Sequence, residues 1–117
     1  MTLHEVQRIL GAEVLALQEE MDRDIHSACG ADLMSDVLAF SKEKVLLLTG
    51  LINPQVIRTA EMMDIKAIAF VRGKSPSEEM LTLAREKDMV ILTTGHPMYI
   101  ACGLLYSNGL TGGGVRI

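Results

Sequence analysis

The sequence has 117 residues, 49% of them apolar, and its eleven basic and fifteen acidic side chains leave a net charge of −4. This length and apolar content predict one folded domain with its own core and exclude a disordered chain. The acidic balance and the scarcity of aromatic residues argue against nucleic-acid binding. No apolar run is long enough to span a bilayer, and residues 1–10 lack the pattern of a signal peptide, so we expect a cytoplasmic protein with no membrane partner.

The first part of the chain is predicted to begin with a helix. Thr2 and Glu5 have the spacing of a capping box, and Gly11 is a typical helix stop. Further elements expected before residue 45 are a strand at 12–17, a polar connection at 19–24, a strand at 25–29 and a short helix at 31–44. Asp32 is the expected cap of that helix, which also includes Phe40, although the stretch VLAF at its centre is compatible with a strand as well.

Residues 45–109 have a clearer pattern, in which three apolar strands alternate with helices. The strands lack polar alternation, as expected when both faces are buried, and they are predicted at Val45–Thr49, Ala67–Val71 and Met89–Thr93. Asn53 followed by Pro54 is a strong helix start. Ser75 and Glu78 have the spacing of a second capping box, which predicts the start of the next helix.

A last helix is expected over residues 96–109, with four apolar side chains facing inward: Ile100, Ala101, Leu104 and Leu105. The short connections between strands and helices require right-handed crossovers, which predicts an α/β domain with a mainly parallel sheet and helices on its faces. We expect a single domain over residues 1–117, with its core at about 20–109 and a flexible tail at 110–117.

Three turns follow the predicted parallel strands, at residues 49–53, 72–75 and 93–96. In open parallel sheets, ligands bind outside the carboxyl ends of the strands, and helix N-termini at that edge favour anions. The predicted ligand-binding residues are therefore Thr49, Gly50, Asn53, Arg58, Thr93, Thr94, Gly95 and His96. The turns at Gly50 and Gly95 rank above the one at Gly73, because Glu78 places a negative charge beside the latter. The alternative is that these glycines only make tight turns.

Signatures of catalysis are not found in the sequence. It has neither a P-loop nor a G-x-G-x-x-G fingerprint, its histidines and cysteines lack the spacing of metal ligands, and no acid–base pair is indicated. We therefore expect no catalytic residue, no metal and no cofactor. Cys29 and Cys102 are expected to be reduced thiols packed as small apolar side chains.

Two short elements connect the chain to a known family. The stretch Asp22-Arg23-Asp24-Ile25 matches a DR-x-I element, and Ala31-Asp32-Leu33 matches an A-D-L element that precedes the parallel βα units. Over about residues 20–108 the sequence resembles the DRTGG domain family, which is similar to the N-terminal domain of HPr kinase/phosphorylase. The resemblance implies a three-layer α/β/α domain that serves as an accessory or regulatory module. It does not imply kinase activity, because that chemistry belongs to a separate P-loop domain.

The sequence thus favours a ligand-sensing or protein-interaction module without chemistry of its own. We expect it to form a homodimer or a larger homo-oligomer, and to bind a small anionic ligand or a protein partner. One alternative is a small enzyme acting on a phosphorylated metabolite. Another is a purely structural subunit.

Overall fold

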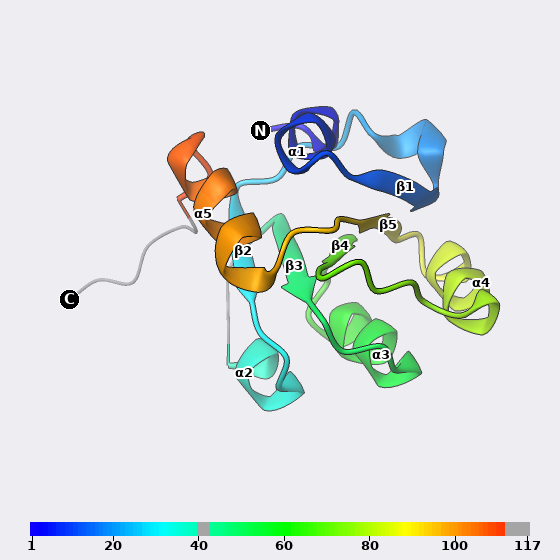
Figure 1. Ribbon diagram of the computed structural model, residues 1–117. Helices are drawn as coiled ribbons and strands as arrows, with labels where there is room; N and C mark the ends of the chain where they lie inside the picture. The colour runs from blue at the N-terminus through cyan, green and yellow to red at the C-terminus, as the bar shows by residue number, and fades with distance from the viewer. Residues whose placement is uncertain (40–42, 112–117) are drawn as a thin grey trace.

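A five-stranded sheet with helices on both faces organises the chain in a computed structural model, which describes residues 1–39 and 43–111 (Figure 1). The strand order is β1-β5-β4-β3-β2. Its centre consists of three parallel strands, β3 (Val45–Thr49), β4 (Ala67–Phe70) and β5 (Val90–Thr93). These were predicted as neighbouring parallel strands, each followed by a helix, and the prediction is confirmed.

The two edges of the sheet differ in direction. At one edge β2 (Ser27–Gly30) runs parallel to β3, and at the other β1 (Glu13–Ala16) runs antiparallel to β5. Both correspond to strands expected at 25–29 and 12–17. A 3₁₀ turn, η1 (Gln18–Glu20), lies in the polar connection between them.

Helices cover both faces, so the fold has the expected three layers. One layer holds α1 (Leu3–Leu10) and α5 (Met98–Ser107), and the other holds α2 (Met34–Leu38), α3 (Pro54–Met62) and α4 (Glu78–Glu86). Successive side chains of a strand point to opposite faces, so Leu46 and Leu48 pack under the first layer and Leu47 under the second. All five residues of β3 are buried, as their unbroken apolar pattern predicted.

Local capping signals explain where most helices begin. Thr2 and Glu5 form the predicted capping box of α1, and Gly11 ends that helix with a left-handed φ of 58°. Asn53 caps α3 by accepting a hydrogen bond of 2.8 Å from the Gln55 N–H.

Two predicted caps are wrong. The N-cap of α4 is Ser77 rather than Ser75, and the Ser77 hydroxyl accepts a bond of 3.2 Å from the Met80 N–H. Two nearby serines compete for this position, and the observed register buries Met80 while Glu78 becomes the first helical residue. The N-cap of α2 is Leu33, which has no side-chain cap, because the Asp32 carboxylate bonds elsewhere. Phe40, expected in the same helix, lies outside the described residues.

The orientation of α5 is only partly as expected. Ala101 and Leu105 are buried, but Leu104 is half-buried and Ile100 is 42% exposed. A helix that is apolar on all sides carries no periodicity to identify its buried stripe, which here is set by contact with α1 and β3. The core continues beyond the helix, since Leu110 is buried and its N–H bonds to the Leu105 carbonyl. Residues 112–117 of the expected tail lie outside the described residues.

Candidate ligand site at the carboxyl edge of the sheet

The turns after β4 and β5 are joined by backbone hydrogen bonds at the carboxyl edge of the sheet. The Arg72 N–H donates to the His96 carbonyl and the Gly73 N–H donates to the Thr94 carbonyl, both at 2.8 Å. Arg72 and Gly73 both have a left-handed backbone, with φ of 59° and 67°. Glycine adopts this conformation without strain. That Gly73 serves mainly to turn the chain stays a prediction.

The turn after β3 is organised by Asp32. Its Oδ1 accepts a bond of 2.7 Å from the Gly50 N–H and one of 3.2 Å from the hydroxyl of the buried Thr49. The Thr49 hydroxyl in turn accepts from the Leu51 N–H. The premise that no acidic group serves this turn is therefore wrong. The acidic group is Asp32, which follows the neighbouring strand β2 and lies 18 positions from Gly50 in the sequence. An anion binding here would compete with a carboxylate for the Gly50 amide.

Arg72 lies directly over Gly50. A Cβ added at Gly50 would collide with the Arg72 guanidinium, so the absence of a side chain there allows the close approach. The guanidinium is 3.9 Å from Asp32 Oδ2, and both side chains are about half exposed. Neither Asp32 nor Arg72 was among the predicted site residues. The A-D-L element and the place of Arg72 after a buried strand were the signals that could have found them.

The two threonines at the end of β5 use their hydroxyl groups in hydrogen bonds within the fold. The Thr93 hydroxyl donates to the Lys74 carbonyl at 2.7 Å, and the hydroxyl of the buried Thr94 donates to the Leu10 carbonyl at 2.8 Å. Gly95 is exposed and borders open space, and His96 is half-buried. The part of this turn that a ligand could reach is therefore Gly95 and His96 rather than the two hydroxyls.

The helix N-termini at this edge differ in how they are capped. Asn53 and Ser77 satisfy backbone N–H groups of α3 and α4, whereas α5 starts after Pro97 with no side-chain cap. The first N–H groups of α5, next to His96, are thus without a side-chain acceptor in the part of the chain that is described. Arg58 is exposed on α3 and makes no ion pair or hydrogen bond to this edge among the described residues.

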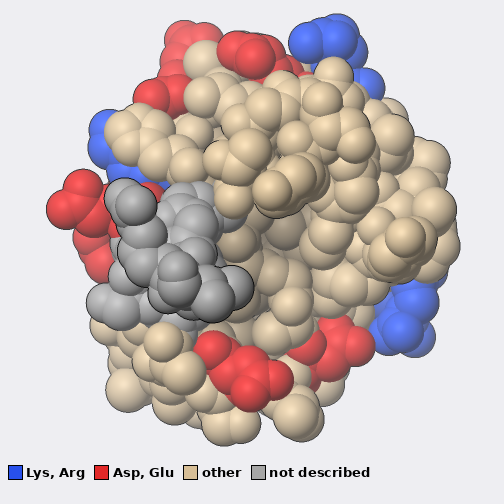
Figure 2. All heavy atoms as spheres, turned by 90° about the vertical axis from the view of Figure 1, so that its left-hand side faces the viewer, with Lys and Arg blue, Asp and Glu red and all other residues tan. Residues whose placement is uncertain are grey.

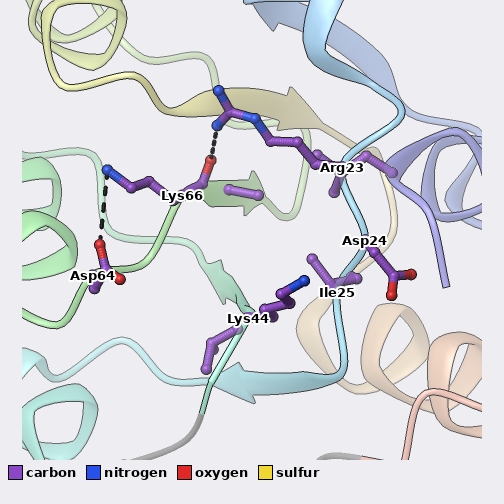
Figure 3. Close-up of a pocket in the computed structure, with 9 residues that line it drawn as sticks. Arg23, Asp24, Ile25, Lys44, Asp64 and Lys66 are labelled. Atoms are coloured by element: carbon purple, nitrogen blue, oxygen red, sulfur yellow. Dashed lines mark hydrogen bonds and ion pairs between the residues drawn. The ribbon is translucent and has the colours of Figure 1, made fainter.

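A cavity of about 380 Å³ lies at the opposite, amino edge of the sheet (Figure 3). The apolar part of its lining is Leu3, Ile25, Val45 and Ala67, and the charged part is Arg23, Asp24, Lys44, Asp64 and Lys66. The sequence did not point to this cavity, because its residues come from separate elements that only the sheet brings together. Asp64 and Lys66, two residues apart on the connection between α3 and β4, form a long ion pair of 3.8 Å.

The DR-x-I element lies at this amino edge and has a structural role. The Arg23 guanidinium donates to the Asp88 carbonyl at 2.7 Å and to the Lys66 carbonyl at 3.3 Å, and it pairs with the Asp88 and Glu20 carboxylates. Arg23 therefore ties its segment to the residues just before β4 and β5. Asp24 binds the amino terminus at 3.0 Å. With these partners, Arg23 has little capacity left for a ligand.

Other reactive groups are packed into the fold. Both cysteines are free; Cys29 is buried and Cys102 half-buried. Burial raises the pKa of each thiol, and the Asp36 charge adds to the rise at Cys29. Within residues 1–39 and 43–111, no three His, Cys, Asp or Glu residues are grouped to hold a metal ion. No helix in the described part of the chain is long and apolar enough to cross a membrane.

Comparison with known proteins supports the fold. The chain is similar to a solved structure of the CBS and DRTGG domains from the regulatory region of a Clostridium perfringens pyrophosphatase, in complex with its activator diadenosine tetraphosphate. The TM-score is 0.75 at 20% identity, over 89% of this chain and 45% of that one. This likeness shows a DRTGG-like α/β fold. The chain spans less than half the length of that protein chain. No family model matches the sequence, and neither does any curated protein.

Proposed function

We propose that this chain is a cytoplasmic regulatory module that binds a small anionic molecule at the carboxyl edge of the sheet and has no catalytic activity. The observation that carries the proposal is the Arg72 guanidinium, held over Gly50 where the turns after β3, β4 and β5 meet. Gly95, His96 and the uncapped start of α5 lie on the neighbouring turn. Positive groups from two turns thus converge on one edge.

Arg72 is available for a ligand because its internal ion pair is weak. Its guanidinium is 3.9 Å from Asp32 and both groups are about half exposed, a geometry in which an ion pair contributes about 0–1 kcal/mol. A phosphate could accept two parallel bonds from the same guanidinium, a stronger arrangement than the existing contact. We therefore expect the ligand to contact Arg72, Gly95 and His96 rather than Thr49 and Thr94.

The structural neighbour supports a regulatory role and suggests a class of ligand. That protein's domains belong to a regulatory region and were solved with a dinucleotide activator, and this chain shares the fold at 20% identity. Phosphorylated nucleotides are accordingly the first ligands to test. A small enzyme acting on a phosphorylated metabolite is the alternative, and a purely structural subunit is the third.

A thermal-shift experiment with inorganic phosphate, pyrophosphate, ATP and diadenosine tetraphosphate tests the proposal. A ligand at 100 times its Kd stabilises the folded state by about 2.7 kcal/mol, which raises the Tm of a domain of this size by roughly 5–15 °C. Arg72→Gln should abolish the shift. Arg85→Gln is the matched control, because it removes the same charge from the last turn of α4, whose end faces the amino edge.

A second pair of variants separates geometry from charge. Gly50→Ala keeps every charge but displaces the Arg72 guanidinium, so it should lower the shift. Gly103→Ala, in the middle of α5, adds its methyl group to open space outside the proposed site and should preserve the shift. Shifts that survive both Arg72→Gln and Gly50→Ala but vanish in Lys44→Gln would place the ligand in the amino-edge cavity instead. Turnover of ATP or pyrophosphate that Arg72→Gln abolishes would favour the enzyme.

A further inference from the structure

The C-terminal part of the chain is unusually free of charge. Residues 89–115 contain no Lys, Arg, Asp or Glu, although these make up 22% of the whole sequence. This stretch includes α5, of which only Ala101 and Leu105 are buried. Its outer side chains face solvent: Tyr99 is 86% exposed and Tyr106 65%. A helix with one short buried stripe and an apolar outer side leaves that outer side to be covered by something else.

The uncharged surface continues from α5 onto the edge strand β2. A narrow cleft of about 210 Å³ separates them, with Gly30 on one wall and Cys102 and Tyr106 on the other. A Cβ at Gly30 would lie 2.8 Å from the Cys102 sulfur, so the helix packs closely on the strand. Figure 2 shows this side of the molecule, with a broad uncharged area and the charged residues toward its margin.

The two edges of the sheet are protected to different degrees. At β1 the pairing is interrupted between Val14 and Ala16, Glu13 adds a charge, and Arg85 donates to the Leu15 carbonyl at 3.4 Å. These are devices that keep an edge strand from pairing with another chain. The residues of β2, Ser27–Gly30, include no charged residue and no proline, and their register with β3 is regular. Among the described residues, the edge without such features is therefore β2, next to the apolar helix α5.

We propose that α5 and the adjoining edge of β2 form the interface of a homodimer. A two-fold axis brings a surface patch against the same patch of the second copy, so any charge in it meets a like charge nearby. With a net charge of −4, this chain disfavours self-association through most of its surface, and the α5 face avoids that repulsion. Exposed tyrosines are typical of such contacts, and the face carries no charge that would select a basic or acidic partner.

The test measures molar mass by light scattering at tens of micromolar, where a dimer with a micromolar Kd is largely formed. Tyr99→Asp and Tyr106→Lys each place a charge on the face. An acid in the first turn of a helix and a base in the last turn are favourable, so neither change should unfold the monomer. The controls are Gln55→Asp and Met62→Lys, exposed residues at the start and end of α3 in the opposite layer.

The wild type and both α3 variants are expected to be dimers. Tyr99→Asp and Tyr106→Lys should each raise the dimer Kd at least tenfold, while circular dichroism shows an intact fold. A monomeric wild type would overturn the proposal and indicate that the face is covered in another way. The proposal also fails if both α5 variants remain dimers, or if the α3 variants dissociate equally. None of these results depends on the proposed ligand.

Discussion

Asp32→Ala should reveal how the carboxyl edge is held together. Asp32 accepts hydrogen bonds from the Gly50 N–H at 2.7 Å and from the Thr49 hydroxyl at 3.2 Å. Both of those residues are buried, so removing the carboxylate leaves two donors that water reaches poorly. If Asp32 were instead the cap of α2, its loss would affect only a five-residue helix.

The expected loss of stability follows from these contacts. A hydrogen bond to a charged acceptor contributes about 1.5–3 kcal/mol. At the lower end of that range the two bonds would contribute about 3 kcal/mol. Because Asp32 is about half exposed and water can replace part of its role, we reduce this to about 2 kcal/mol in total. The Asp32–Arg72 contact adds less than about 1 kcal/mol. The sum corresponds to a decrease in the urea midpoint on the order of 1 M.

Urea unfolding followed by circular dichroism measures the effect, with Asp36→Ala as the matched control. Asp36 is an exposed aspartate in the first turn of α2, and its removal should cost less than about 1 kcal/mol. A double-mutant cycle with Thr49→Val should give a coupling free energy of at least about 0.5 kcal/mol, because the two side chains share a hydrogen bond. Equal losses for Asp32→Ala and Asp36→Ala, together with no coupling to Thr49, would refute this account of the turn.

Two further predictions concern titratable groups away from that edge. Hydrogen bonds from the amino terminus, and then from His26, lower the pKa of Asp24, so its stabilising effect is present above an unfolded pKa of about 3.9 and lost as the pH falls through the folded value. Asp24→Asn should therefore lower the urea midpoint at pH 6 but not at a pH low enough to protonate the Asp24 carboxyl in the folded as well as the unfolded chain. Equal losses at all pH values would contradict this. Burial raises the pKa of the Cys29 and Cys102 thiols, so both should react with a thiol reagent at pH 7.5 at least tenfold more slowly in buffer than in urea. Reaction of either thiol at the unfolded rate would show that it is exposed.

The sequence by itself determined the elements whose signals are local. Unbroken apolar runs identified β3, β4 and β5, and the Asn53-Pro54 and Thr2–Glu5 patterns identified the starts of α3 and α1. These features depend on residues within a few positions of one another, where backbone sterics and capping bonds act. The alternation of strands and helices was sufficient to predict a parallel sheet and to put the turns at 49–53, 72–75 and 93–96 at one edge.

The tertiary structure decided which polar groups at that edge are already used. Asp32 reaches Gly50 across 18 positions of sequence, and Thr94 reaches Leu10 across 84, so no local pattern could reveal that these amide and hydroxyl groups are occupied. The same holds for Arg72, which is displayed over Gly50 only because β3 and β4 are neighbours. Ligand binding at this edge stays a prediction. The exposed side of α5 also emerged only from the packing, because a helix that is apolar all around buries the stripe that its neighbours contact, and here those neighbours are α1 and β3.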